Sequence, residues 1–127
     1  MTQTVAQRGG IIENLEERYA AAVALMAAEG IYIKHYRPTI YLDNGDVIRV
    51  QNGGLTVAYR RLKGNSFVEI ATAICSARDM YNRKVGTTLS VEAFASAQRI
   101  RVPDFGATPG AVVNRLFAEY VCFEDEA

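Results

Sequence analysis

Three short turns divide residues 31–75 into strand-like runs, and this spacing constrains the fold of the 127-residue chain more than any other feature. The turns, at 43–46, 51–54 and 63–66, are rich in Asn and Gly, which tolerate the backbone conformations of tight turns. The first contains an Asn-Gly pair, a strong signal for a β-hairpin. Because turns this short connect antiparallel neighbours, the sequence predicts an antiparallel β-meander of four or five strands.

A helix is predicted before this meander. Between Ile11 and Glu29, apolar residues recur at steps of three and four, and many alanines raise the helix propensity. Gly30 ends the pattern. We interpret this helix as a packing element, in the core or in a dimer interface. Residues 1–10 are polar and end in two glycines, so we expect a flexible arm there.

Helical patterns return after the meander, at residues 87–99. This segment either continues a helix that starts at Asp79 and kinks at Gly86, or begins a new helix near Thr88 or Ser90. In both cases the alanine-rich pattern predicts that its apolar side packs on the sheet.

A last helix completes the predicted fold. A helix is predicted over 109–123, with Thr108 as its candidate cap. Pro109 supports this start, because Pro at the first helical position has the φ angle that a helix needs. Residues 124–127 form an acidic tail, and residues 11–123 form a single domain. The predicted fold class is therefore α+β: an N-terminal helix, an antiparallel β-meander of four to five strands, then C-terminal helices packed on one face.

The stretch between meander and later helices, residues 75–86, carries the clearest functional signal. A predicted strand over 67–75 leads into Ser76, and Asp79 follows at the spacing of an imperfect capping box, which predicts a helix N-terminus. Beside a helix N-terminus, cations, a ring and an amide suit a ligand that carries a phosphate and a base. The candidate ligand-binding residues here are Arg78, Tyr81, Asn82, Arg83 and Lys84.

These residues also have purely structural interpretations. Tyr81 suits a core ring where a helix meets the sheet, and Asn82 suits an exposed helix face. Arg99 and Arg101 follow the next predicted helix, where cations stabilise a helix C-terminus without any ligand.

The charge of the chain is zero overall but uneven. Residues 30–101 hold eleven Lys or Arg against five Asp or Glu, a net charge of +6, whereas residues 1–29 carry −2 and residues 102–127 carry −4. A positive middle between acidic ends suits a protein that holds an anion, and equally suits ordinary solvated charges. The lack of strong overall negative charge argues against a whole-molecule DNA mimic.

Composition predicts a packed, water-soluble domain in a reducing cytoplasm. Half of the residues are apolar and 22% are charged, which favours a globular core. No apolar run reaches the ~18 residues of a membrane span, and residues 1–10 lack the apolar region of a signal peptide. The cysteines, Cys75 and Cys122, are too few for a disulfide framework.

The motifs of common enzymes are absent from the sequence. There is no phosphate-binding glycine loop, no dinucleotide-binding glycine pattern and no nucleophile elbow. The single histidine, His35, lies in a predicted strand, where a surface or packing role is more typical than a base. Two distant cysteines without matching histidines do not form a zinc site. We therefore predict no catalytic residue, no metal and no cofactor.

The pattern Cys-Ser-x-x-Asp-x-aromatic-Asn-x-Lys-x-Gly at 75–86, after a strand and before an alanine-rich helix, resembles a pattern of small phage proteins. Among these are the Thoeris anti-defence proteins, which act as sponges for cyclic nucleotide signals. The resemblance covers roughly residues 55–100. It implies an antiparallel sheet with C-terminal helices, assembly into dimers or larger oligomers, and sequestration of a cyclic ADP-ribose-type messenger without cleavage.

The resemblance also implies roles for individual residues. Asn82 and Lys84 match the asparagine and lysine of the motif, and Arg99 falls where the following helix could return a guanidinium to phosphate. The helix at 11–29 and the segment 109–123 have no counterpart in it.

Our hypothesis is thus a non-catalytic phage protein that sequesters a cyclic nucleotide in the host cytoplasm as a homo-oligomer. Tyr81 and Asn82 would contact the base, and the phosphate would be held by Arg78, Arg83, Lys84 and Arg99. The alternative is a small inhibitor or adaptor that binds a host protein or nucleic acid through the basic middle of the chain.

Overall fold

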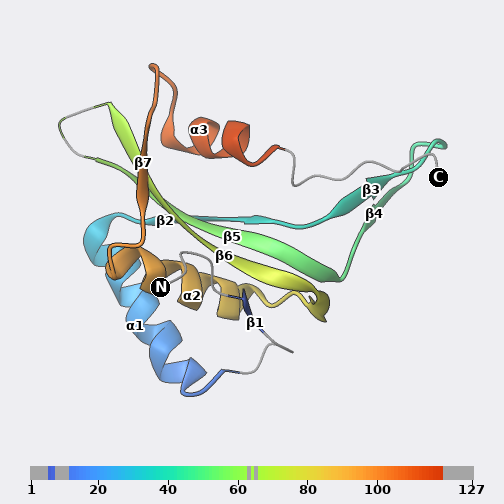
Figure 1. Cartoon of the computed structure of the whole chain (residues 1–127), viewed down its shortest axis with the longest axis horizontal. Helices are drawn as coiled ribbons and strands as arrows, with labels where there is room; N and C mark the ends of the chain where they lie inside the picture. Colours follow the sequence, from blue (N-terminus) through green and yellow to red (C-terminus); the bar gives the residue numbers. More distant parts are fainter. Residues whose placement is uncertain (1–5, 8–11, 63, 65, 119–127) are drawn as a thin grey trace.

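The computed structural model describes residues 6–7, 12–62, 64 and 66–118 (Figure 1). The predicted acidic tail and Cys122 lie outside these residues, and the last helix, predicted over 109–123, already ends at Leu116. In chain order the elements are β1 (Ala6–Gln7), α1 (Leu15–Glu29), β2 (Tyr32–Tyr36), β3 (Thr39–Tyr41), β4 (Val47–Arg49), β5 (Asn52–Arg61), β6 (Phe67–Met80), α2 (Arg83–Ala95), β7 (Ile100–Pro103) and α3 (Pro109–Leu116).

The main sheet is built around the long strand β6. Its order is β1-β6-β5-β2, and β7 also pairs with β6. The pairs β2–β5, β5–β6 and β6–β7 are antiparallel, and the short β1 runs parallel to β6. Together with the helices before and after the sheet, this arrangement confirms the predicted α+β class.

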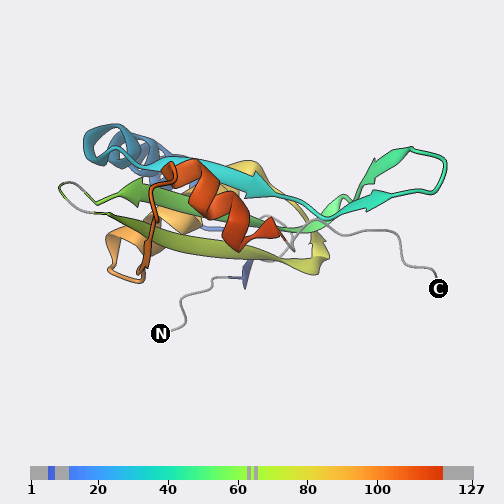
Figure 2. The ribbon, with the colours of Figure 1, turned by 90° about the horizontal axis from the view of Figure 1, so that it is seen from above.

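The hairpin of β3 and β4 forms a separate two-stranded sheet that extends away from the main sheet (Figures 1 and 2). It confirms the turn predicted at 43–46. Gly45 has a φ of 93°, and the side chain of Asn44 accepts a hydrogen bond from the amide of Asp46. A positive φ at this position explains the preference for glycine.

The turn predicted at 51–54 is wrong. β5 begins at Asn52 and runs through both glycines, with a bulge between Asn52 and Gly54. Gly53 and Gly54 have φ angles of 82° and 150°, and a side chain at Gly54 would overlap the ring of Tyr81. The two glycines therefore serve a strand bulge and a close side-chain approach, uses that a Gly-rich sequence does not distinguish from a turn.

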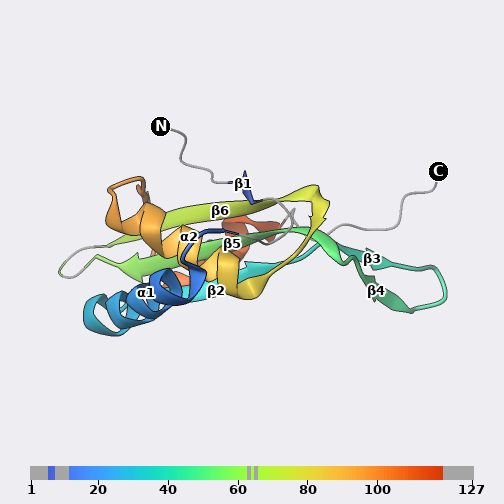
Figure 3. The ribbon, with the colours of Figure 1, turned by 90° about the horizontal axis from the view of Figure 1, so that it is seen from below.

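Helices cover both faces of the main sheet. α1 and α2 lie on one face (Figure 3), where Ala71 and Phe94 share an apolar cluster. α3 lies on the other face (Figure 2), where Ile70 and Val113 share a second cluster. The later helices thus divide between the two faces, because successive side chains of β6 point to opposite sides and both sides are apolar. In the described residues, no helix has the length and apolar character to cross a membrane.

The predicted helix start at Ser76 is also wrong, because β6 continues to Met80. Beyond the bulge, Met80 pairs with Asn52 of β5, and the amide of Tyr81 donates to the carbonyl of Gln51 at 2.9 Å. The pairing with Asn52 and the hydrogen bond to Gln51, just before β5, extend the strand past the capping pattern. A local sequence pattern does not reveal them.

The helix α2 begins at Arg83, so both predicted starting regions are wrong. The side chain of Asn82 is the cap, accepting a hydrogen bond from the amide of Val85 at 3.0 Å. α2 passes through Gly86 as continuous helix. Here Gly86 lets α2 approach β5, since a side chain at this position would overlap the hydroxyl of Thr56.

Candidate functional site

The side chain of Tyr81 is fixed where β6 gives way to α2. Its ring packs against Gly54, and its hydroxyl lies 2.5 Å from Oγ1 of Thr56 and 2.6 Å from Nδ1 of His35. Nδ1 of His35 lies 3.1 Å from the same threonine oxygen. The strand register places His35 of β2 opposite Thr56 of β5. Three segments thus contribute one hydrogen-bonded cluster.

This cluster is uncharged at neutral pH. Burial, and then the charge of Arg83, lower the pKa of His35 to about 4, so the imidazole is neutral. Burial raises the pKa of Tyr81 above its ordinary value, although the hydrogen bond with Thr56 and two nearby arginines oppose the shift. A weakly basic imidazole and a weakly acidic phenol favour hydrogen bonding over proton transfer.

Arg37 covers the ring of Tyr81 from outside the cluster. Its guanidinium carbon lies 5.1 Å from the ring centroid, and Nη2 donates to the carbonyl of Val50 at 3.1 Å. Its Nε is buried and has no hydrogen-bond partner among the residues that the structure describes. A buried N–H without a partner is costly, so this atom is a donor that a ligand oxygen would satisfy.

Arg83 adds a second guanidinium at the N-terminus of α2. It lies near enough to lower the pKa values of both His35 and Tyr81. Within the described residues, neither Arg83 nor Arg37 forms an ion pair with a carboxylate. Ion pairs engage Arg18, Arg60, Arg61, Lys84, Arg99 and Arg101 instead. We call His35, Arg37, Tyr81 and Arg83 the corner site.

Three of the predicted ligand-binding residues do not offer their side chains to the corner site. The side chain of Asn82 is occupied as the cap of α2. Lys84 points to α1 instead, where Nζ lies 2.8 Å from the carboxylate of Glu16. Arg78 is exposed near the end of β6, and its amide donates to Oγ of Ser76 at 3.1 Å.

Arg99, the sixth predicted residue, lies beyond the opposite end of α2. The helix separates it from Arg83 by about 20 Å, at the usual rise per residue. Its Nε donates to the buried carboxylate of Glu69 at 3.1 Å, and Nη1 donates to the carbonyl of Phe94 at 2.6 Å. Arg60 donates to the same carboxylate at 2.7 Å. The six predicted residues therefore do not form one site.

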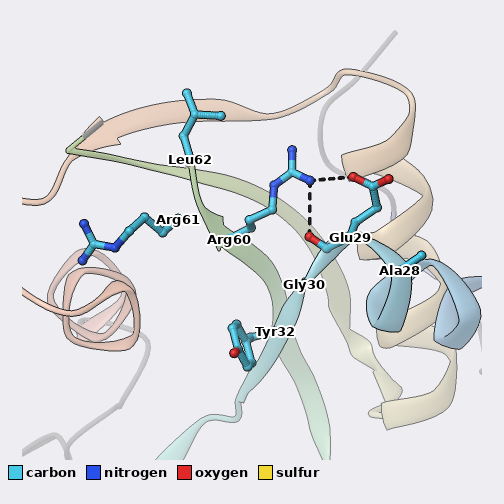
Figure 4. Close-up of a pocket in the computed structure, with 7 residues that line it drawn as sticks. All are labelled: Ala28, Glu29, Gly30, Tyr32, Arg60, Arg61 and Leu62. Carbon is cyan, nitrogen blue, oxygen red and sulfur yellow. Dashed lines mark hydrogen bonds and ion pairs between the residues drawn. The ribbon is translucent and has the colours of Figure 1, made fainter. Parts of the chain in front are cut away.

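A cavity of about 500 Å³ lies near this second group of arginines (Figure 4). Its lining residues are Ala28, Glu29, Gly30, Tyr32, Arg60, Arg61 and Leu62. Arg60 donates to the carboxylate of Glu29 at 2.7 Å and to its backbone carbonyl, and Arg61 points away toward Asp104, with which it pairs. Both guanidinium groups at this cavity are already neutralised, in contrast with those of the corner site.

The sequence interpretation missed His35 and Arg37 as members of the site. His35 lies in β2 and Arg37 directly follows it, and both precede Tyr81 by more than forty residues. The signal that would have found them is the pairing of β2 with β5, because it places His35 opposite Thr56. A hairpin inserted between β2 and β5 hides that pairing in the sequence.

The lowered pKa of His35 predicts a pH dependence of stability. Because the folded pKa is about 4 and the unfolded value is 6.5, the folded state resists protonation. The free energy of unfolding should therefore fall by about 1–2 kcal/mol as the pH drops from 6.5 to 4, a value reduced because the ring is only half buried. Urea unfolding of wild type and His35→Gln across this range tests it: the variant should lack this component, and identical slopes would contradict it.

No family model, curated protein or solved structure matches this chain. In the part of the chain that the structure describes, no group of three or more His, Cys, Asp or Glu side chains is arranged to hold a metal ion. The corner site therefore has to be interpreted from its own geometry.

Proposed function

We propose that this protein binds a small phosphorylated ligand, without catalysis, at the corner site. The observation that carries the proposal is the pair of guanidinium groups, Arg37 and Arg83, beside Tyr81 with no carboxylate partner in the described chain. Guanidinium groups bind phosphate oxygens through charge-assisted hydrogen bonds, and the N-terminus of α2 adds a favourable dipole.

Each residue of the site has a distinct role in this proposal. Arg37 offers its buried Nε to a phosphate oxygen, and the ring of Tyr81 supports its guanidinium. Arg83 supplies the second charge. His35 fixes the tyrosine hydroxyl and stays neutral, which suits a scaffold role better than acid–base catalysis.

The resemblance over residues 55–100 narrows the ligand class. We propose a cyclic nucleotide of the cyclic ADP-ribose type, sequestered as a phage anti-defence protein would hold it. In this proposal Asn82 and Tyr81 order the site rather than contact the base directly, since one caps α2 and the other is covered by Arg37.

Calorimetric titration tests the proposal with four probes: inorganic phosphate, pyrophosphate, ADP and cyclic ADP-ribose. We expect the nucleotides to bind more tightly than phosphate alone, and Arg37→Ala or Arg83→Ala to weaken binding by about 10- to 100-fold, as loss of a charge-assisted hydrogen bond does. Arg115→Ala, which removes an exposed cation on α3, is the control of equal charge and should bind as wild type.

Two results would contradict the proposal. One is that none of the four probes binds. The other is that Arg115→Ala weakens binding as much as the corner variants, because only net charge would then matter. A single-stranded oligonucleotide tested at low and high salt separates the alternative function, since binding to many phosphates weakens steeply with salt.

A further inference from the structure

Lys34 and Tyr59 lie beneath the first turn of α3, on the opposite face of the main sheet from His35. Tyr59 shares an apolar cluster with Val113 of α3. Because successive side chains of β2 point to opposite faces, Lys34 faces α3 while His35 belongs to the corner site. A side chain at Gly110 would begin 3.5 Å from the hydroxyl oxygen of Tyr59 and 3.8 Å from Nζ of Lys34. Lys34, Tyr59 and Gly110 therefore meet at the N-terminus of α3.

The hydroxyl of Tyr59 is a polar group without a partner. Tyr59 is 8% exposed, and its hydroxyl forms no hydrogen bond with any residue that the structure describes. By contrast, the hydroxyl of Tyr36 on the same face donates to Oδ1 of Asn114 at 2.6 Å. Burial, and then the nearby Tyr32, raise the pKa of Tyr59 above its ordinary value, so this hydroxyl keeps its proton at neutral pH. Since buried polar groups normally have a partner, the hydroxyl is a donor available to a ligand at the start of α3.

Lys34 makes the same position positively charged. It is half-buried and forms no ion pair within the described part of the chain. Lys84, in contrast, pairs with Glu16. Arg61, which donates to a backbone carbonyl just before α3, is already paired with Asp104. The charge of Lys34 is therefore not balanced by any carboxylate that the structure describes.

The backbone of α3 contributes to this position as well. The first N–H groups of a helix have no partner within the helix. Pro109 has no N–H, and the amide of Ala111 donates to the hydroxyl of Thr108 at 3.3 Å. The amide of Gly110 has no hydrogen-bond partner among the described residues. The positive end of the helix dipole adds to the charge of Lys34, and the lack of a side chain at Gly110 leaves the approach to these groups open.

We propose that Lys34, the hydroxyl of Tyr59 and the amide of Gly110 bind a carboxylate group of a small ligand, at a site separate from the corner site. One ammonium group balances the single charge of a carboxylate. A doubly charged oxyanion would keep an unbalanced charge in a half-buried position, which is costly. The corner site, with two guanidinium groups, suits the higher charge of a phosphate. This inference does not depend on the proposed function, because the two sites lie on opposite faces of the sheet.

Titration of the full chain with acetate, followed by NMR, tests this proposal. The protein is isotope-labelled at its backbone amides and tyrosine rings, and sodium chloride keeps the ionic strength constant, so that general screening does not change. We expect the amide of Gly110 and the ring of Tyr59 to shift along one saturable binding curve. Sulfate, a doubly charged oxyanion, should bind more weakly than acetate at these two residues.

Three substitutions each remove one feature of the site. Lys34→Met removes the charge and keeps an apolar stem, Tyr59→Phe removes only the hydroxyl, and Gly110→Ala fills the space between them. Each should weaken acetate binding by about 10- to 100-fold, as loss of a charge-assisted hydrogen bond does. Lys84→Met is the matched control, because it removes a lysine that is already paired with Glu16, and it should bind acetate as wild type.

Thermal unfolding separates a binding role of Tyr59 from a structural one. Because its hydroxyl has no partner in the described fold, Tyr59→Phe should melt at or above the temperature of wild type while it loses affinity for acetate. A lower melting temperature would show that the hydroxyl already has a partner, contrary to the proposal. The absence of a saturable shift at Gly110, wild-type affinity in any of the three variants, equal weakening by Lys84→Met, or tighter binding of sulfate than of acetate would each overturn it.

Discussion

Replacing Glu69 by Gln is expected to lower the free energy of unfolding by about 3–5 kcal/mol, the cost of breaking a buried ion pair from one side. Glu69 is 1% exposed and accepts hydrogen bonds from Arg60 at 2.7 Å and Arg99 at 3.1 Å, with Arg101 at 3.6 Å. The substitution keeps the volume of the side chain and removes its charge. Three guanidinium groups would then crowd together with no carboxylate between them.

The ring of Phe94 couples this ion-pair network to the core. The guanidinium carbons of Arg60 and Arg99 lie 5.1 and 4.9 Å from its centroid. If repulsion displaces either arginine, the cation–π contact with Phe94 is lost as well. The effect of the Glu69→Gln substitution therefore extends beyond a single hydrogen bond.

Chemical denaturation measures this effect, and Glu92→Gln is the matched control. Glu92 pairs with Arg18 at 2.5 Å, but both side chains are partly exposed, so the same substitution there should cost about 1 kcal/mol or less. Burial raises the pKa of Glu69, but the hydrogen bonds from Arg60 and Arg99 outweigh it and hold the pKa below 4.5. The contribution of this carboxylate is thus present above pH 4.5 and lost as the pH falls through the folded pKa.

The difference in the free energy of unfolding between wild type and Glu69→Gln should accordingly become smaller in acid. If the Glu69 and Glu92 substitutions lower the free energy of unfolding equally at neutral pH, then burial of the carboxylate does not set the strength of its ion pairs.

Gly86→Ala is expected to destabilise the fold by about 1–3 kcal/mol, although alanine favours a helix over glycine by about 1 kcal/mol. The new methyl group would overlap the hydroxyl of Thr56, which is fully buried and belongs to the cluster with Tyr81 and His35. Relief requires α2 to move away from β5 or Thr56 to change rotamer. Either change disturbs the corner site, so ligand binding should weaken along with stability.

The control for this substitution is Gly110→Ala on α3. A methyl group at Gly110 would meet the side chain of Lys34 at 3.4 Å, an ordinary contact distance. This variant should unfold at the same or a slightly higher urea concentration than wild type. If Gly86→Ala is also neutral, then close approach of α2 to β5 is not what the glycine provides.

Local patterns in the sequence were sufficient for most of the fold. The helix up to Gly30 and the turn at Gly45 follow from residues that are adjacent in the chain. So does the cap at Thr108, whose hydroxyl accepts a hydrogen bond from the amide of Ala111.

The features that the sequence did not predict depend on pairing between strands that are distant in the chain. Ser76 and Asp79 have the spacing of a helix cap, but β6 pairs with β5 on both sides of them, at Cys75 and at Met80, and stays a strand until Met80. The same pairing determines where Tyr81 lies. The candidate site therefore differs from its prediction more than the fold does. The site retains Tyr81 and Arg83 and adds His35 and Arg37, which lie in β2 and just after it. Arg99 belongs instead to the ion-pair network of Glu69.

The proposed function requires an anion to bind between Arg37 and Arg83. We would titrate isotope-labelled protein with pyrophosphate and follow the arginine Nε–Hε groups and the backbone amides by NMR. The Nε–Hε signal of Arg37 and the amide of Arg83 should shift together, while the Nε–Hε signals of Arg60 and Arg99 stay in place. Shifts at Arg60 and Arg99 with an unchanged Arg37 would contradict it.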